Sequence, residues 1–116
     1  MLLQKLEQVH QDHVLSVPNG FENIASTTLC PCHGFVRFSS SSPPETSDRK
    51  ELLKQIQIFS LQGHPEFTSD IVKDIIDVRE TRGVLSRDFS AESRERASQE
   101  QEGVSIGRTI LEILGA

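Results

Sequence analysis

Residues 55–67, QIQIFSLQGHPEF, join a short apolar run to a glycine and then to a His-Pro-Glu sequence. The apolar side chains of the run are Ile56, Ile58, Phe59 and Leu61. Residues of this kind favour extended backbone, and the run is short enough for a buried strand. The sequence therefore predicts a buried strand over 55–62, followed by Gly63, which permits a sharp turn.

Pro65 restricts the residue before it, because its ring clashes with α-helical backbone at that position. His64 is therefore expected in extended backbone, where residues i and i+2 project to the same side. Glu66 would then lie beside His64, accept its Nδ1–H, and leave the other ring nitrogen free to act as a base. From these residues alone, the pair is either part of a catalytic set or a solvated pair in a turn.

Composition limits the classes of protein to consider. The 116 residues are 35% hydrophobic and 25% charged, with six Phe and neither Trp nor Tyr, so one small domain would build its core from Leu, Ile and Val. The net charge of −5 argues against nucleic-acid and anionic-membrane partners, which need clustered Lys and Arg. With two cysteines and neither a signal peptide nor a membrane-spanning run, the chain is expected to be reduced and cytoplasmic.

Strands are expected within 22–38, before the apolar run. ENIASTT (22–28) and GFVRF (34–38) carry residues that favour extended backbone. Pro18-Asn19-Gly20, just before them, is typical of a turn, because Pro restricts φ while Asn and Gly accept left-handed backbone.

Residues 39–50, SSSSPPETSDRK, contain no apolar side chain and cannot contribute to a core. We interpret them as a flexible Ser/Pro loop. A phosphorylated regulatory loop, centred on Ser42-Pro43, is the alternative.

Helices are expected after the His-Pro-Glu sequence. Apolar residues repeat at helical spacing within 69–82, with Thr68 or Ser69 as the N-cap and Gly83 as the stop. The polar segment 86–102 predicts a mostly exposed helix, and 104–114 predicts an amphipathic one. A β-rich first part followed by a strand, a motif and helices suits the C-terminal part of an α/β sandwich better than a complete doubly wound sheet.

QGHPEF resembles the His-Pro-Glu signature of the class I glutamine amidotransferases. VHQDHVLSVPNGFENIASTTLCP (9–31) resembles the stretch that precedes this signature, especially in members similar to the GMP synthase glutaminase domain and the plant γ-glutamyl peptidases. The resemblance implies that 1–116 is the C-terminal half of such a domain, with a flavodoxin-like α/β fold. It further implies a glutaminase-type hydrolase that cleaves the glutamine side-chain amide, or a γ-glutamyl bond, through a Cys-His-Glu triad without a cofactor.

The resemblance assigns roles to residues of this chain by position. His64 would be the general base and Glu66 its orienting partner. The backbone around Val9, Gln11 and Asp12 would contact the glutamine or γ-glutamyl substrate.

The nucleophilic cysteine is missing from this pattern, because the family carries it upstream in a Gly-x-Cys-x-Gly elbow. Cys30 and Cys32 have neither that elbow nor a following helix pattern, so we expect them to be structural thiols. Cys30, Cys32 and His33 lack a fourth zinc ligand, and the pair His10 and His13 lacks a third, so no metal site is expected.

A half domain lacks the apolar contacts of its other half, and losing them outweighs the small net stability of a folded domain. The chain is therefore expected to need its missing N-terminal half or a protein partner, and to be inactive alone. Two functions stay open: the His/Glu half of an active site, or a non-catalytic module that binds a protein through the 56–61 strand and the last helix.

Overall fold

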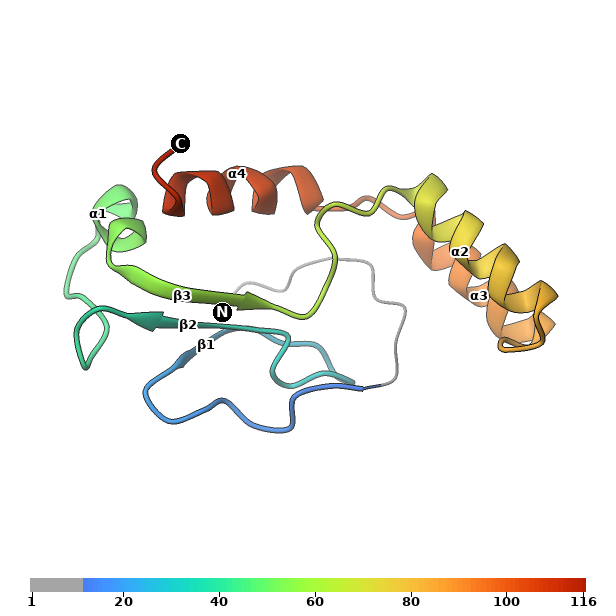
Figure 1. Cartoon of the computed structure of the whole chain (residues 1–116), viewed down its shortest axis with the longest axis horizontal. Helices are drawn as coiled ribbons and strands as arrows, with labels where there is room; N and C mark the ends of the chain where they lie inside the picture. Colours follow the sequence, from blue (N-terminus) through green and yellow to red (C-terminus); the bar gives the residue numbers. More distant parts are fainter. Residues whose placement is uncertain (1–11) are drawn as a thin grey trace.

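The computed structural model describes residues 12–116. The elements are, in order, β1 (Glu22–Ala25), β2 (Gly34–Phe38), α1 (Arg49–Lys54), β3 (Ile56–Leu61), α2 (Ser69–Thr81), α3 (Arg87–Ala97) and α4 (Gly103–Ile113). The strands form an antiparallel sheet in the order β1-β2-β3 (Figure 1). The predicted mixed α/β class is therefore confirmed for the described residues.

The central strand β2 carries the buried part of the sheet. Val36 is buried and pairs with Phe59 of β3. Helix α4 lies along β3, and its buried Ile106 shows which side of the helix packs inward (Figure 1). The other end of α4 is joined to α1, because Arg49 of α1 donates hydrogen bonds to Thr109 and Glu112.

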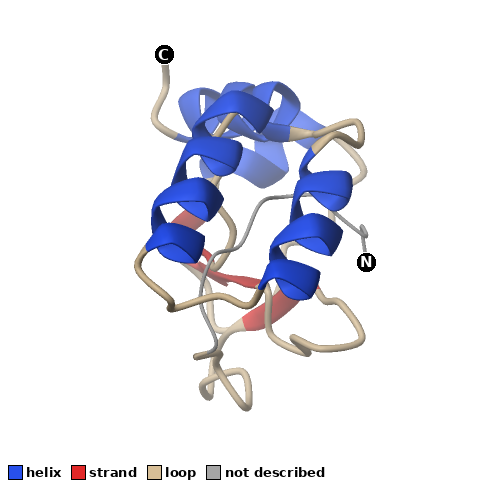
Figure 2. Cartoon of the chain, turned by 90° about the vertical axis from the view of Figure 1, so that its right-hand side faces the viewer, coloured by secondary structure: helices blue, strands red, loops and turns tan. Residues whose placement is uncertain are grey.

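Helices α2 and α3 form a hairpin beside the sheet (Figure 2). Thr68 caps α2 by accepting the backbone N–H of Ile71, and Gly83 follows the helix with φ of +73°. Both features confirm the sequence-based boundaries. The hairpin has its own core of Val72, Ile76 and Ala97, against which Phe67 and Leu85 pack.

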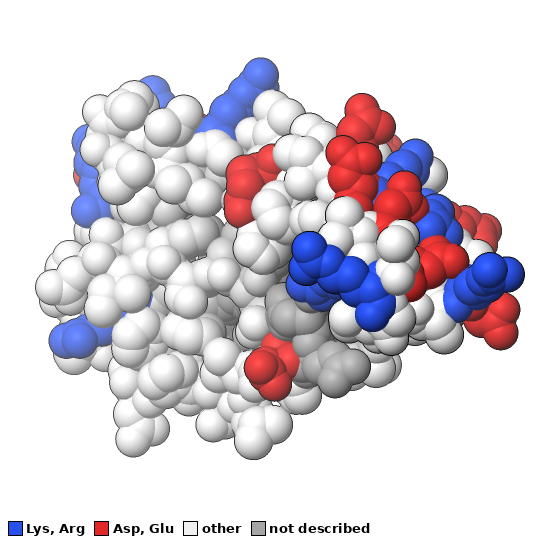
Figure 3. Space-filling view, turned by 45° about the vertical axis from the view of Figure 1, so that its right-hand side comes forward, with Lys and Arg blue, Asp and Glu red and all other residues white. Residues whose placement is uncertain are grey.

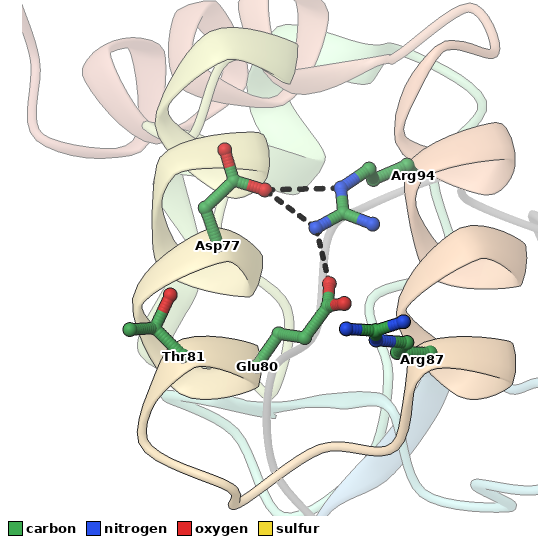
Figure 4. A pocket seen from close by; sticks show the side chains of 5 residues that line it. All are labelled: Asp77, Glu80, Thr81, Arg87 and Arg94. Carbon is green, nitrogen blue, oxygen red and sulfur yellow. Dashed lines mark hydrogen bonds and ion pairs between the residues drawn. The ribbon is translucent and has the colours of Figure 1, made fainter.

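Charged side chains gather over this hairpin, while much of the remaining surface in the same view is uncharged (Figure 3). Arg94 of α3 donates to Asp77 and Glu80 of α2 across an open groove of about 450 Å³, lined also by Thr81 and Arg87 (Figure 4). The bonds to Asp77 and then Glu80 raise the pKa of Arg94. Solvent screens these exposed charges, so they orient the two helices more than they stabilise the fold.

Two predictions about the strands need correction. The strand expected over 22–28 ends at Ala25, because Thr27 and Cys30 close a turn with hydrogen bonds in both directions. The strand expected over 55–62 is present as β3, but it is not buried: Ile58 is 40% exposed. An apolar strand sequence specifies extended backbone without specifying how many layers cover it.

Helix α1 was not predicted, and it shortens the Ser/Pro loop. Arg49 and Lys50 belong to the helix, so only 39–48 of the predicted loop lacks a helix or strand. Asp48 causes the difference, because its side chain accepts the backbone N–H groups of Lys50 and Glu51 and caps the helix.

The molecule is elongated, with dimensions of 49 × 29 × 18 Å. Its radius of gyration is 16.3 Å, whereas a compact domain of this length has roughly 13 Å. The sheet and the helical hairpin therefore lie side by side and share little common core. Across residues 12–116, every helix is too short or too polar to cross a lipid bilayer.

The hairpin core gives a stability prediction. Ile76 is 2% exposed, whereas Ile71 on the same helix is 41% exposed. We expect Ile76→Ala to lower the free energy of unfolding by about 2–5 kcal/mol, because it removes buried methyl groups and leaves a cavity. Ile71→Ala, the matched control, should cost less than half as much in the same urea titration followed by circular dichroism. Equal losses would contradict this assignment of the core.

Candidate active site

Strand β3 leads directly into the His-Pro-Glu turn. Just after the strand, the backbone N–H of Gln62 donates to the carbonyl of His33 at 2.8 Å, which extends the pairing with the β1–β2 side of the sheet. Gly63 is buried, and Phe67 N–H donates to the His64 carbonyl at 3.2 Å, which closes the turn. The turn is therefore anchored to the sheet at its start and closed by its own backbone.

The turn brings His64 and Glu66 together, as the extended backbone before Pro65 predicts. His64 Nδ1 lies 2.7 Å from Glu66 Oε1. An ionised carboxylate can only accept a hydrogen bond, so Nδ1 carries the proton in this contact and Nε2 is the available base. The hydrogen bond from His64, followed by one from the Glu66 backbone N–H, lowers the pKa of Glu66.

Phe67 orients the His64 ring from a second direction. The two rings are stacked, with centroids 4.2 Å apart and planes 8° apart. Phe67 also packs against the α2/α3 core, so the plane of the imidazole is set by a side chain that the hairpin holds. Sequence reasoning missed this role, although an aromatic residue directly after His-Pro-Glu is visible in the sequence.

The predicted substrate-contacting residues are only partly described. Val9 and Gln11 lie outside the described residues. Asp12 is exposed, and its backbone carbonyl accepts a hydrogen bond from Gln62 Nε2 at 3.3 Å. The chain around Asp12 therefore lies next to the residue that enters the His-Pro-Glu turn. The roles of these residues and of the His64–Glu66 pair stay predictions.

The two cysteines have the environment of structural thiols. Both are free and buried in the turn that connects β1 to β2. Burial raises the pKa of the Cys30 thiol, which disfavours the thiolate that a nucleophile requires. His33 is buried nearby. Its backbone N–H donates to the Ala25 carbonyl, and its carbonyl accepts the backbone N–H of Gln62. Within residues 12–116, no three His, Cys, Asp or Glu side chains cluster closely enough to hold a metal ion.

Comparison with known proteins gives two similar sequences. One is a Saccharomyces cerevisiae protein named "putative glutamine amidotransferase", 29% identical over 105 residues, which cover 90% of this chain and 35% of that protein. The other is a Schizosaccharomyces pombe protein named "putative glutamine amidotransferase-like protein", 26% identical over 109 residues, which cover 94% of this chain and 37% of that protein. The chain thus spans just over a third of the length of these relatives.

No protein-family model matches the chain, and no solved structure matches it significantly. The two yeast proteins support a glutamine amidotransferase-like family for this chain.

Proposed function

We propose that the chain supplies the histidine and glutamate of a class I glutamine amidotransferase active site. The 2.7 Å contact between His64 Nδ1 and Glu66 Oε1 carries this proposal, because it holds the imidazole in the tautomer with Nε2 free. Stacking on Phe67 adds support, since it orients the ring before substrate binds. The reaction is hydrolysis of the glutamine side-chain amide or of a γ-glutamyl bond.

The chemistry follows from this geometry. His64 Nε2 takes the proton of a cysteine thiol, and the thiolate attacks the amide carbon to form a tetrahedral oxyanion. Collapse to a thioester breaks the C–N bond, and the imidazolium donates its proton to the leaving nitrogen. Water, deprotonated by Nε2, then hydrolyses the thioester and regenerates the thiol. Glu66 stabilises the imidazolium in both halves of the cycle.

The cysteine in this proposal comes from polypeptide outside the chain. Burial of Cys30 and Cys32 supports this assignment, because neither thiol is available to a substrate. The relatives, about two and a half times as long as the chain, also support it. The half-exposed strand β3 and the elongated shape add to this support. In this interpretation, β1–β3 and the helices form part of a flavodoxin-like sandwich that the other segment completes.

Activity should depend on the missing segment and on His64. Mixing the chain with a polypeptide segment that carries a Gly-x-Cys-x-Gly elbow should release ammonia from glutamine, or free glutamate from a γ-glutamyl peptide. His64→Ala should lower kcat/KM by about 10²–10⁴-fold, the range for removal of a general base. The chain alone should be inactive in the same coupled assay.

Lys50→Ala is the control, because Lys50 is an exposed residue of α1 that lies outside the turn and outside the segment around Asp12. It should leave the reconstituted activity unchanged. Full activity of His64→Ala, or an inactive wild-type pair with both substrates, would overturn the proposed function.

The hydrogen bond between His64 and Glu66 also gives a pH prediction. The pKa of Glu66 is lowered in the folded chain, so the pair's contribution to stability is complete above the unfolded-state pKa. It is lost as the pH falls through the lower, folded-state pKa. His64→Ala should raise the Glu66 pKa toward the ordinary glutamate value of about 4.3, measured by ¹³C NMR of its carboxyl carbon. An unchanged Glu66 titration in His64→Ala would show that the contact is absent in solution.

A second candidate function rests on the outer side of α4. Val104 and Leu111 are 71% and 53% exposed and lie on the side of α4 that faces away from the buried Ile106. Leu114, the C-cap residue, is 74% exposed and continues this apolar surface past the end of the helix. An exposed apolar row of this kind is typical of a protein-binding surface. It favours a non-catalytic interaction module if the reconstituted pair proves inactive.

This surface should cause self-association at high concentration. We expect the 13.0 kDa chain to elute from a size-exclusion column ahead of a monomer, and Leu111→Ser/Leu114→Ser to move it toward the monomer position. Ile71→Ser is the control, because it also replaces an exposed apolar side chain, on α2. It should leave the elution position of the chain unchanged. A wild-type chain that is monomeric at all concentrations would contradict the apolar row as a binding surface.

A further inference from the structure

Gly103, the first residue of α4, lies directly against the backbone of Pro65. A Cβ at position 103 would lie 2.3 Å from the Pro65 carbonyl oxygen and 3.2 Å from its carbonyl carbon. Any side chain there would overlap backbone atoms, which cannot rotate away as a flexible side chain can. The contact therefore requires glycine, and it joins α4 to the middle residue of the His-Pro-Glu turn.

The same helix is anchored at its other end. Arg49 of α1 donates to Thr109 and Glu112 near the C-terminal end of α4. Helix α1 directly precedes β3, whereas Pro65 follows it. Helix α4 therefore begins beside the turn that follows β3 and ends beside α1, which precedes β3 (Figure 1). Ile106 is buried between these two contacts.

Pro65 is the residue between His64 and Glu66, so its backbone angles set the two side chains relative to one another. Its ring fixes φ near −65°, so ψ of Pro65 is one of the few backbone angles, with ψ of His64 and φ of Glu66, that still set the two side chains relative to one another. Changing ψ turns the peptide group that contains the Pro65 carbonyl and swings Glu66 relative to His64. The close approach of Gly103 to this carbonyl opposes that movement.

We propose that Gly103 is a positioning residue for the His64–Glu66 pair, and that α4 acts as the support that sets the turn at the end of β3. Its importance for catalysis rests on the proposed function. The contact itself is independent of any activity, so the inference can be tested on the 116-residue chain.

Gly107 provides the matched control. It lies four residues further along α4, where an added Cβ would meet no atom within 4 Å. Replacement of glycine by alanine inside a helix ordinarily stabilises it. Gly103→Ala and Gly107→Ala therefore make the same chemical change on one helix, and only the first intrudes on Pro65.

The test measures the Glu66 titration by ¹³C NMR in the wild-type chain and both variants. The α2/α3 methyl signals are recorded in the same samples, to confirm that the hairpin is folded. Gly103→Ala should raise the Glu66 pKa toward that of His64→Ala, because the displaced turn weakens the hydrogen bond that lowers it. Gly107→Ala should match the wild type. A wild-type titration in folded Gly103→Ala, or equal shifts in both variants, would overturn the inference.

If Gly103→Ala does not fold, a second measurement tests the contact between Gly103 and Pro65 in the wild-type chain. In the wild-type chain, the α-protons of Gly103 and Pro65 should give a nuclear Overhauser cross-peak, because an ideal Cβ on Gly103 would lie 3.4 Å from the Pro65 Cα. Absence of that cross-peak would overturn the inference. An upward Glu66 shift in Gly103→Ala supports it whether or not amide hydrolysis is detected, so the failures of the two proposals are distinguishable.

Discussion

The stack of the His64 ring on Phe67 is the interaction on which the arrangement of the candidate site depends. Phe67 packs against the α2/α3 core, so the contacts that hold it form whether or not a substrate is present. The imidazole plane is therefore set by apolar packing, whereas its tautomer is set by Glu66. Packing on Phe67 thus sets the ring plane and the hydrogen bond to Glu66 sets the tautomer, which is the preorganisation that the proposed general-base role of His64 requires.

The sheet and the hairpin are two small structural units that meet at the His-Pro-Glu turn. Val36 and Ile106 mark the buried part near the sheet, and Val72 and Ile76 mark the hairpin core. The turn belongs to neither unit, so its position reflects both.

Much of the fold could be predicted from local sequence. The β2 and β3 strands, the Thr68 cap and the Gly83 stop follow from backbone preferences and capping, which act over a few residues. Helix α1 could not be predicted with the same rules, because six residues carry too little periodicity and the Asp48 cap is its main signal. The exposure of Ile58 also escaped prediction, since burial depends on which other layers cover a strand.

The sequence by itself determined the pairing of His64 with Glu66, because Pro65 restricts the backbone between them and places both side chains on one side. The sequence also shows the resemblance to glutamine amidotransferases, because that resemblance rests on the order of residues in the His-Pro-Glu motif and in the segment before it. Only the tertiary structure decided that Phe67 orients the imidazole and that Gly103 lies against Pro65. Phe67 is held by the core of the hairpin, and Gly103 is nearly forty positions from Pro65 along the chain. Contacts of this kind depend on how distant segments pack, so no local backbone preference encodes them.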